Sequence, residues 1–148
     1  MVLISNSPRE TMSIGKRIAK KLRKGDILCL FGEFGSGKTI LTKGIALGLS
    51  LKKEEIISPS FVLLRQYSKA KIPLYHFDLY RLKKMQEIIS LGYEEYFYNQ
   101  GITVVEWAGR LKSLLPKEYL SINLEIIGPK KRKIEIIPLG SHYEDISY

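Results

Sequence analysis

The sequence contains little cysteine and no long hydrophobic run, and each absence excludes a class of protein. Cys29 is the single cysteine in 148 residues, so neither an internal disulfide nor a cysteine-based zinc cluster can form. No apolar run is long enough to span a bilayer, and residues 1–4 are too short an apolar stretch for a signal sequence. We therefore expect a protein of a reduced, cytoplasmic compartment with no membrane association.

Internal repeats, linkers and low-complexity segments are also missing. A chain of this length fits one domain that can bury a core without disulfides or structural metals. Apolar residues make up 45% of the sequence and charged residues 26%, and both values are ordinary for a folded protein. We expect one domain over residues 1–148, in which residues 139–148 form a flexible tail.

Negative charge is in short supply as well. The 15 Asp and Glu residues face 24 Lys and Arg residues, which gives a formal charge of +9. Such an excess suits a protein that works near a polyanion, whether a nucleotide, RNA or an acidic protein surface. A generally lysine-rich composition without functional meaning accounts for the charge equally well. The cations concentrate in residues 16–24 and 130–133.

The apolar pattern alternates between helix-like and strand-like segments. Ser7, Pro8 and Glu10 predict a capping box at the start of a helix, with Ser7 as the N-cap and Glu10 reaching back to it. A continuous apolar run at 27–31 is typical of a strand buried on both faces. The pattern predicts further helices at 38–49, at 84–98 with a break at Gly92, and before residue 115, and further strands at 61–67, 74–78, 102–106, 119–127 and 133–138. We expect an α/β fold.

A glycine-rich loop at residues 32–39 carries the strongest functional signal. It matches Gly-x-x-x-x-Gly-Lys-Thr, and it follows a predicted buried strand and opens a predicted helix, as a phosphate-binding loop does. The backbone amides of such a loop cradle phosphate oxygens, its lysine reaches the β- and γ-phosphates, and its hydroxyl binds Mg²⁺. We therefore expect ATP or ADP with Mg²⁺ to contact Glu33, Phe34, Gly35, Ser36, Gly37, Lys38, Thr39 and Ile40.

Two acids end predicted strands, where an α/β sheet binds its ligands. Asp78 closes the segment 74–78, and Glu106 closes the segment 102–106. A P-loop enzyme needs such an acid to hold the magnesium shell or to orient the attacking water. We expect Lys38, Asp78 and Glu106 to be catalytic, and the pattern alone leaves open which acid contacts the metal.

Two ring side chains stand next to these acids. Trp107 follows Glu106 directly and is expected at the rim of the same site, where it could stack on a base or a partner; a role in the core is an equal alternative. His76 alternates to the same strand face as Asp78. A lone strand histidine is more often a hydrogen-bonded structural residue than a catalyst, and we interpret His76 in that way.

The chain as a whole resembles the TsaE family, also called YjeE. The resemblance rests on segments that occur in order, namely 32–39, the Ser-Pro-Ser-Phe at 58–61, the Tyr-His-Phe-Asp-Leu-Tyr-Arg at 75–81, the Leu-Gly at 91–92 and the Val-Glu-Trp at 105–107, with the late basic segment around Arg132. The string from His76 to Arg81 is far more specific than the P-loop itself.

The resemblance implies a fold, an activity and a site. The fold is a single P-loop NTPase domain with a mixed central sheet flanked by helices. The activity is a weak ATPase that supports the making of N6-threonylcarbamoyladenosine at position 37 of bacterial tRNA, together with the partner proteins TsaD and TsaB. Thr39 and Glu106 would contact magnesium, and Asp78 would be a Walker-B-like acid.

Further contacts with the nucleotide are implied at more distant positions. Ser7 and Thr11 would lie near the base, with Trp107 and Arg132 also in the nucleotide site. Ser60 stands where the family usually has threonine. Its loop resembles a sensor of the γ-phosphate, and serine keeps the hydroxyl that such a role needs.

Two other functional classes remain open at this stage. A small-molecule kinase also carries a P-loop, but it normally needs an arginine-bearing lid, and no such insertion is visible in the sequence. A nucleic-acid-binding module regulated by its nucleotide is the other class. The basic segment at 16–24 permits it, but no aromatic-basic motif demands it.

Overall fold

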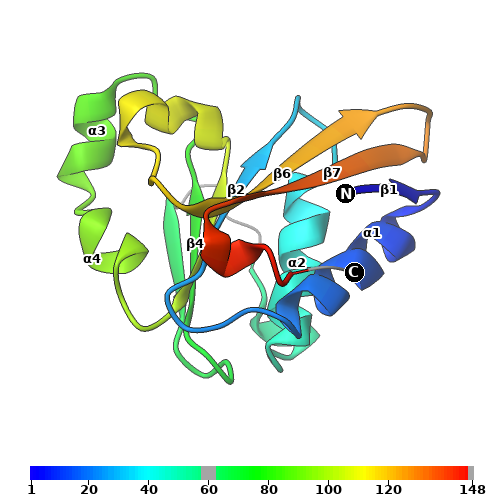
Figure 1. Ribbon diagram of the computed structural model, residues 1–148, viewed down its shortest axis with the longest axis horizontal. Helices are drawn as coiled ribbons and strands as arrows, with labels where there is room; N and C mark the ends of the chain where they lie inside the picture. The colour runs from blue at the N-terminus through cyan, green and yellow to red at the C-terminus, as the bar shows by residue number, and fades with distance from the viewer. Residues whose placement is uncertain (58–62, 147–148) are drawn as a thin grey trace.

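A mixed β-sheet forms the centre of the fold in this computed structural model, which describes residues 1–57 and 63–146 (Figure 1). The strands of the described ranges lie in the order β1-β7-β6-β2-β5-β4-β3. Their bounds are β1 Val2–Ser5, β2 Ile27–Phe31, β3 Leu64–Tyr67, β4 Leu74–Asp78, β5 Ile102–Glu106, β6 Tyr119–Ile126 and β7 Arg132–Leu139. β2 pairs in parallel with β5 and β6, and β4 with β5, while β1, β3 and β7 pair antiparallel with their neighbours. The predicted mixed α/β sheet is confirmed.

Helices cover both faces of the sheet. The α-helices are α1 Pro8–Ala19, α2 Lys38–Gly48, α3 Met85–Ser90 and α4 Glu94–Phe97, and the 3-10 helices are η1 Lys53–Glu55, η2 Ala108–Leu114 and η3 Ser141–Tyr143. Figure 1 shows α1 and α2 together on one side, with α3 and α4 on the other. No helix in the described part of the chain is long and apolar enough to cross a membrane.

The central strand β2 explains why the apolar run at 27–31 is continuous. Leu28 and Leu30 belong to the core under α1 and α2, whereas Ile27 and Cys29 belong to the core under α3, α4 and η2. Successive side chains of a strand point to opposite faces, so a strand covered on both faces needs apolar residues at every position. Burial raises the pKa of Cys29 to about 12, which makes it an inert core thiol.

Helices α1 and α2 pack in close backbone contact. A Cβ atom on Gly15 would overlap the carbonyl oxygen of Leu41, and one on Gly44 would overlap the carbonyl oxygen of Met12. Only glycine permits such an approach without displacing backbone. The helix that follows the glycine-rich loop is therefore held rigidly against α1.

The start of α1 differs in one detail from the predicted capping box. The Ser7 hydroxyl accepts a hydrogen bond from the Glu10 amide at 3.2 Å, as predicted. The Glu10 carboxylate, however, accepts from the Asn6 amide at 2.6 Å and from the Asn6 side chain at 3.2 Å, not from the cap residue. Asn6 donates to the same Glu10 oxygen from both its backbone amide and its side-chain amide. The backbone of Ser7 could offer that oxygen only one donor.

Both ends of the chain hold more structure than the sequence indicates. Strand β1, which was not predicted, pairs with β7. Residues 139–146, for which a flexible tail was predicted, contain the end of β7 and the 3-10 helix η3. Tyr143 is 3% exposed, its hydroxyl accepts from the Ile27 amide at 2.9 Å, and His142 lies 2.5 Å from the buried Asp26 carboxylate. Buried polar groups need hydrogen-bond partners, and this segment supplies them to the start of β2.

Candidate functional site

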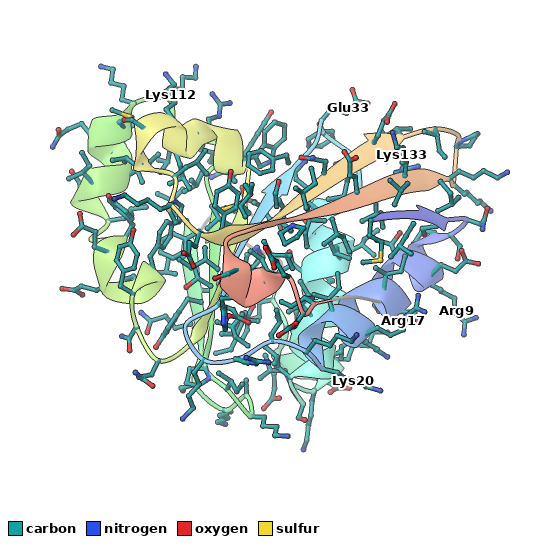
Figure 2. The ribbon with its side chains drawn as sticks, viewed as in Figure 1. Arg9, Arg17, Lys20, Glu33, Lys112 and Lys133 are labelled. Carbon is teal, nitrogen blue, oxygen red and sulfur yellow. The ribbon has the colours of Figure 1, made fainter. Side chains whose placement is uncertain are left out.

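The loop between β2 and α2 has the backbone that its glycines predict. Gly32, Gly35 and Gly37 have φ values of 146°, 78° and 103°. A Cβ atom on Gly32 would lie 2.5 Å from both the Leu124 carbonyl oxygen and the Ser36 hydroxyl. No side chain caps the amides at the start of α2, to which Gly37 is the N-cap. Free amides at a helix N-terminus attract anions. Glu33 marks this loop at the carboxyl end of β2 (Figure 2).

Lys38 lies within the loop. Its ammonium donates to the carbonyl oxygens of Gly32 at 2.7 Å and Glu33 at 2.8 Å, and it lies 3.3 Å from the Ser36 hydroxyl. It is also 4.1 Å from the centre of the Trp107 ring, a cation–π distance. Burial lowers the pKa of Lys38, and the charge of Glu106 partly offsets this. The loop thus holds a positive charge beside its own amides.

Glu106 lies at the floor of the site with three hydrogen bonds. Its Oε2 accepts from the Thr39 hydroxyl at 2.9 Å, and its Oε1 accepts from the Thr42 hydroxyl at 3.0 Å and from His76 Nε2 at 2.8 Å. The residue is 1% exposed. Burial alone would raise the pKa of Glu106, but the bonds from His76, Thr39 and Thr42 hold it below its ordinary value. The carboxylate is therefore kept ionised next to the P-loop hydroxyl.

Asp78 occupies a different position from Glu106. It is the register partner of Glu106 across the β4–β5 ladder, and its Oδ1 accepts from the Tyr80 amide at 3.0 Å. Burial raises the pKa of Asp78, and the Glu106 charge adds to that effect. The structure thus separates two acids that the sequence pattern could not distinguish. Glu106 contacts Thr39, while Asp78 lies beside it at the wall of the site.

Aromatic side chains form the rim. The rings of Tyr80 and Trp107 lie 4.9 Å apart, and those of Phe34 and Tyr80 lie 6.2 Å apart. Trp107 has a left-handed backbone (φ 57°, ψ 41°), which costs a bulky residue about 1–3 kcal/mol. Backbone strain of this kind is concentrated at functional sites. The predicted place of Trp107 at the rim is where the structure has it.

A cavity of 290 Å³ opens between the loop, the acids and the rim. Its volume is at the lower end for small-molecule sites. The described residues that line it are Phe34, Gly35, Gly37, Lys38, Thr39, Ile40, Asp78, Tyr80, Glu106 and Trp107. All of these except Tyr80 were candidates from the sequence, so segments 34–40, 78 and 106–107 converge as expected.

The remaining candidates lie around the cavity. Arg132 Nη2 donates to the Gly35 carbonyl oxygen at 3.0 Å, so the late basic segment does reach the loop. The Thr11 hydroxyl bonds to the Ser5 hydroxyl at 2.7 Å, and its methyl group points towards Gly37. Ser7 caps α1 and is not among the described lining residues. Contacts of Ser7 and Thr11 with a base stay predictions, and Ser60 lies outside the described residues.

Thr42 and Tyr80 are site residues that sequence reasoning missed, and His76 contacts the site more directly than expected. Thr42 follows Thr39 by three positions, so helical spacing places both hydroxyls on one face of α2. His76 is hydrogen-bonded, as predicted, but its partner is the site carboxylate Glu106. Helical and strand periodicity could have found Thr42 and His76. Tyr80 belongs to the string from His76 to Arg81 that carries the family resemblance, but the resemblance gave it no role.

The side chains fit a magnesium ion that shares its ligands with nucleotide phosphates. In the described part of the chain, no group of three or more His, Cys, Asp or Glu could hold a metal by itself. Mg²⁺ bound with ATP usually needs only one or two protein ligands with oxygen donors, because phosphates and water supply the rest. The Thr39 hydroxyl and the Glu106 and Asp78 carboxylates are oxygen donors of this kind. Of these three donors, the buried and ionised Glu106 carboxylate would be stabilised most by a nearby cation.

Comparison with known proteins gives a consistent assignment. The family model described as threonylcarbamoyl adenosine biosynthesis protein TsaE matches residues 5–134. A tRNA threonylcarbamoyladenosine biosynthesis protein TsaE of Bacillus subtilis (strain 168) is 40% identical over 138 residues, which cover 93% of this chain and 85% of that protein. The protein of the same name from Treponema pallidum (strain Nichols) is 36% identical over 136 residues, covering 92% and 99%. The crystal structure of Bacillus subtilis YdiB superposes with a TM-score of 0.86 at 36% identity, covering 99% of this chain and 90% of that one.

Proposed function

Because the chain belongs to the TsaE family of tRNA threonylcarbamoyladenosine biosynthesis proteins, we propose that it binds ATP with Mg²⁺ and hydrolyses it within that machinery. The observation that carries this proposal is the 2.9 Å hydrogen bond from the Thr39 hydroxyl of the P-loop to the buried Glu106 carboxylate. That pair joins the phosphate loop to an ionised acid, as a nucleoside triphosphatase requires. A purely structural P-loop would not need a charge buried at this point.

The residues divide the chemical work among them. The loop amides and Lys38 bind the phosphates and neutralise their charge. Thr39 and Glu106 would hold Mg²⁺, which when bound supplies charge neutralisation at the transferring phosphoryl group. Asp78 is the candidate for orienting the attacking water, because it lines the cavity next to Glu106, its register partner across the β4–β5 ladder.

In this proposal, ATP hydrolysis drives a conformational switch and does not transfer phosphate to an acceptor. The cavity of 290 Å³ that Lys38 and Glu106 line is also lined by the rim aromatics Tyr80 and Trp107, and this volume leaves little room for an acceptor beside a bound nucleotide. A γ-phosphate can order a neighbouring loop and release it after hydrolysis. The ATP-bound state would dock on a TsaD-like and TsaB-like complex in the cytoplasm, and hydrolysis would reset that complex between rounds of tRNA modification. Arg9 and Arg17 on α1 and its C-cap residue Lys20 are exposed cations, which suit docking on an acidic protein surface or on tRNA (Figure 2).

Reconstitution tests this function directly. Purified partner proteins, tRNA, ATP and Mg²⁺ are combined with and without this chain, and the modified tRNA formed per complex is measured over many turnovers. We expect the chain to raise product per complex only when ATP can be hydrolysed. If neither turnover nor complex affinity changes, the switch is refuted. Phosphate transfer to an added acceptor would instead establish a kinase, and tight, salt-sensitive binding of tRNA to the chain alone would establish a nucleic-acid-binding module.

A further inference from the structure

We propose that Thr42 and His76 are positioning residues that hold the Glu106 carboxylate by Oε1, so that Oε2 faces Thr39 and the metal position. The inference rests on the proposed function, since it concerns how the site is set up to take Mg²⁺ with a nucleotide. Neither residue lines the described cavity, so each would act through Glu106 and not on the nucleotide itself.

The contacts divide the carboxylate into a held oxygen and a presented oxygen. Among the described residues, Oε1 accepts from Thr42 at 3.0 Å and from His76 Nε2 at 2.8 Å, while Oε2 accepts from Thr39 at 2.9 Å. Thr42 and His76 are each 3% exposed, so water does not compete for these bonds. The two donors come from different elements, α2 and β4. Two anchors on one oxygen fix the rotation of the carboxylate plane, which a single anchor would leave free.

The histidine must carry a proton on Nε2 for this arrangement. An ionised carboxylate has no proton to donate, so the 2.8 Å contact requires His76 Nε2 to be the donor. The tautomer is therefore assigned by the hydrogen-bond network. A neutral His76 with its proton on Nδ1 would place two lone pairs against each other and release the anchor.

The Thr42 hydroxyl has one proton and two possible acceptors. Its oxygen lies 2.9 Å from the Lys38 carbonyl oxygen and 3.0 Å from Glu106 Oε1, and it can donate to only one of them at a time. Lys38 begins α2, and in an α-helix its carbonyl oxygen has the amide four residues later as its regular partner. The Thr42 proton is therefore available to Glu106.

Stability by itself does not account for this cluster. A buried carboxylate that needs three donors is seldom more stable than a well-packed apolar side chain in its place. Groups that orient a metal-binding side chain, in contrast, contribute directly to metal affinity, and their loss commonly costs about 10–100-fold. Thr42 and His76 have the geometry of such groups.

The test compares variants that keep shape with variants that keep the donor. Thr42→Val and His76→Phe preserve volume and remove the proton donor, whereas Thr42→Ser and His76→Gln preserve a donor near the original position. Calorimetry measures ATP affinity with Mg²⁺ and with a chelator, and phosphate release is measured against Mg²⁺ concentration. We expect Thr42→Val and His76→Phe to need a roughly tenfold higher Mg²⁺ concentration for ATP binding and phosphate release, while their ATP affinity with chelator stays unchanged. For Thr42→Ser and His76→Gln, we expect the Mg²⁺ requirement to stay within about threefold of wild type.

Several results would overturn the inference. One such result is an unchanged Mg²⁺ dependence of ATP affinity in folded Thr42→Val and His76→Phe. Another is an equal loss of Mg²⁺-dependent affinity in His76→Phe and His76→Gln, together with a loss of the ATP affinity measured with chelator. A merely structural role would produce that second result. If ATP affinity of the wild type itself does not depend on Mg²⁺, the proposed function fails first and this inference falls with it.

A measurement on the unmodified protein keeps the inference testable even if a variant does not fold. Nitrogen-15 NMR of the imidazole rings distinguishes the tautomers, and only two histidines are present, so His142 serves as the internal reference. We expect a protonated Nε2 at His76. A neutral His76 with its proton on Nδ1 would refute the anchor.

Discussion

Glu106→Gln is the substitution that separates nucleotide binding from hydrolysis most cleanly. The carboxylate accepts three hydrogen bonds, and the carbonyl oxygen of a glutamine can keep the two from Thr42 and His76. Its amide would face the Thr39 hydroxyl, which would have to accept instead of donate. Shape and most contacts therefore survive, but the buried negative charge is lost.

The magnitudes follow from this exchange. A hydrogen bond to a charged group contributes about 1.5–3 kcal/mol and a neutral one about 1, so each kept bond weakens by roughly 1 kcal/mol. Relief of the buried charge offsets much of that loss, and we expect stability to change little. Phosphate release should fall at least about tenfold, a catalytic effect of ordinary size that corresponds to about 1.4 kcal/mol.

Single-turnover phosphate release and calorimetric titration with ATP are the two assays. Release is measured with enzyme in excess, so that product dissociation does not limit the rate. We expect slow release with ATP binding retained. A variant that releases phosphate as fast as wild type would refute the role of Glu106 and move it to Asp78, whose substitution by asparagine is the matched comparison.

Three further predictions concern other parts of the molecule. Lys38→Ala should abolish useful ATP binding, because no other lysine or arginine lines the described cavity; unchanged calorimetric affinity would contradict the P-loop assignment. Tyr143→Phe should lower the free energy of unfolding by about 1–3 kcal/mol, because it leaves the buried Ile27 amide without its acceptor, and denaturant unfolding with unaltered ATP binding would confirm this. The lowered pKa of Glu106 predicts a pH effect: its ionised form stabilises the fold above the ordinary value of 4.5, and that contribution is lost as pH falls through the folded pKa. The difference in melting temperature between wild type and Glu106→Gln should therefore shift against wild type below about pH 4.5. A pH-independent difference would show that folding does not lower the pKa of Glu106.

Features carried by neighbouring residues were predictable from the sequence. The P-loop is a contiguous motif, and each glycine in it meets a backbone requirement that acts over a few residues, so Gly32 and Gly37 could be identified before the fold was known. Burial on both faces of β2 could also be predicted from neighbouring residues, because a continuous apolar run leaves the strand without a polar face. The break at Gly92 also follows from local backbone preference, and the residue has a φ of 67° between α3 and α4.

Features that depend on distant partners were not predictable in this way. Strand β1 is four residues long, and it becomes a strand only because β7 offers it an edge. The segment 140–146 is ordered because Tyr143 and His142 satisfy polar groups at the start of β2, more than 100 residues earlier in the chain. No local pattern contains that information.

The sequence by itself determined the phosphate loop, the two strand-end acids and the α/β class, because local spacing encodes each of them. Only the tertiary structure decided which of the two acids contacts the P-loop hydroxyl of Thr39. Asp78 and Glu106 end their strands in the same way, but β5 lies next to β2 and β4 lies one strand further out. Strand order therefore brings Glu106, and not Asp78, within 2.9 Å of the Thr39 hydroxyl. Strand order is set by how whole elements pack and pair, and hydrogen bonds between strands do not depend on where their residues stand in the chain.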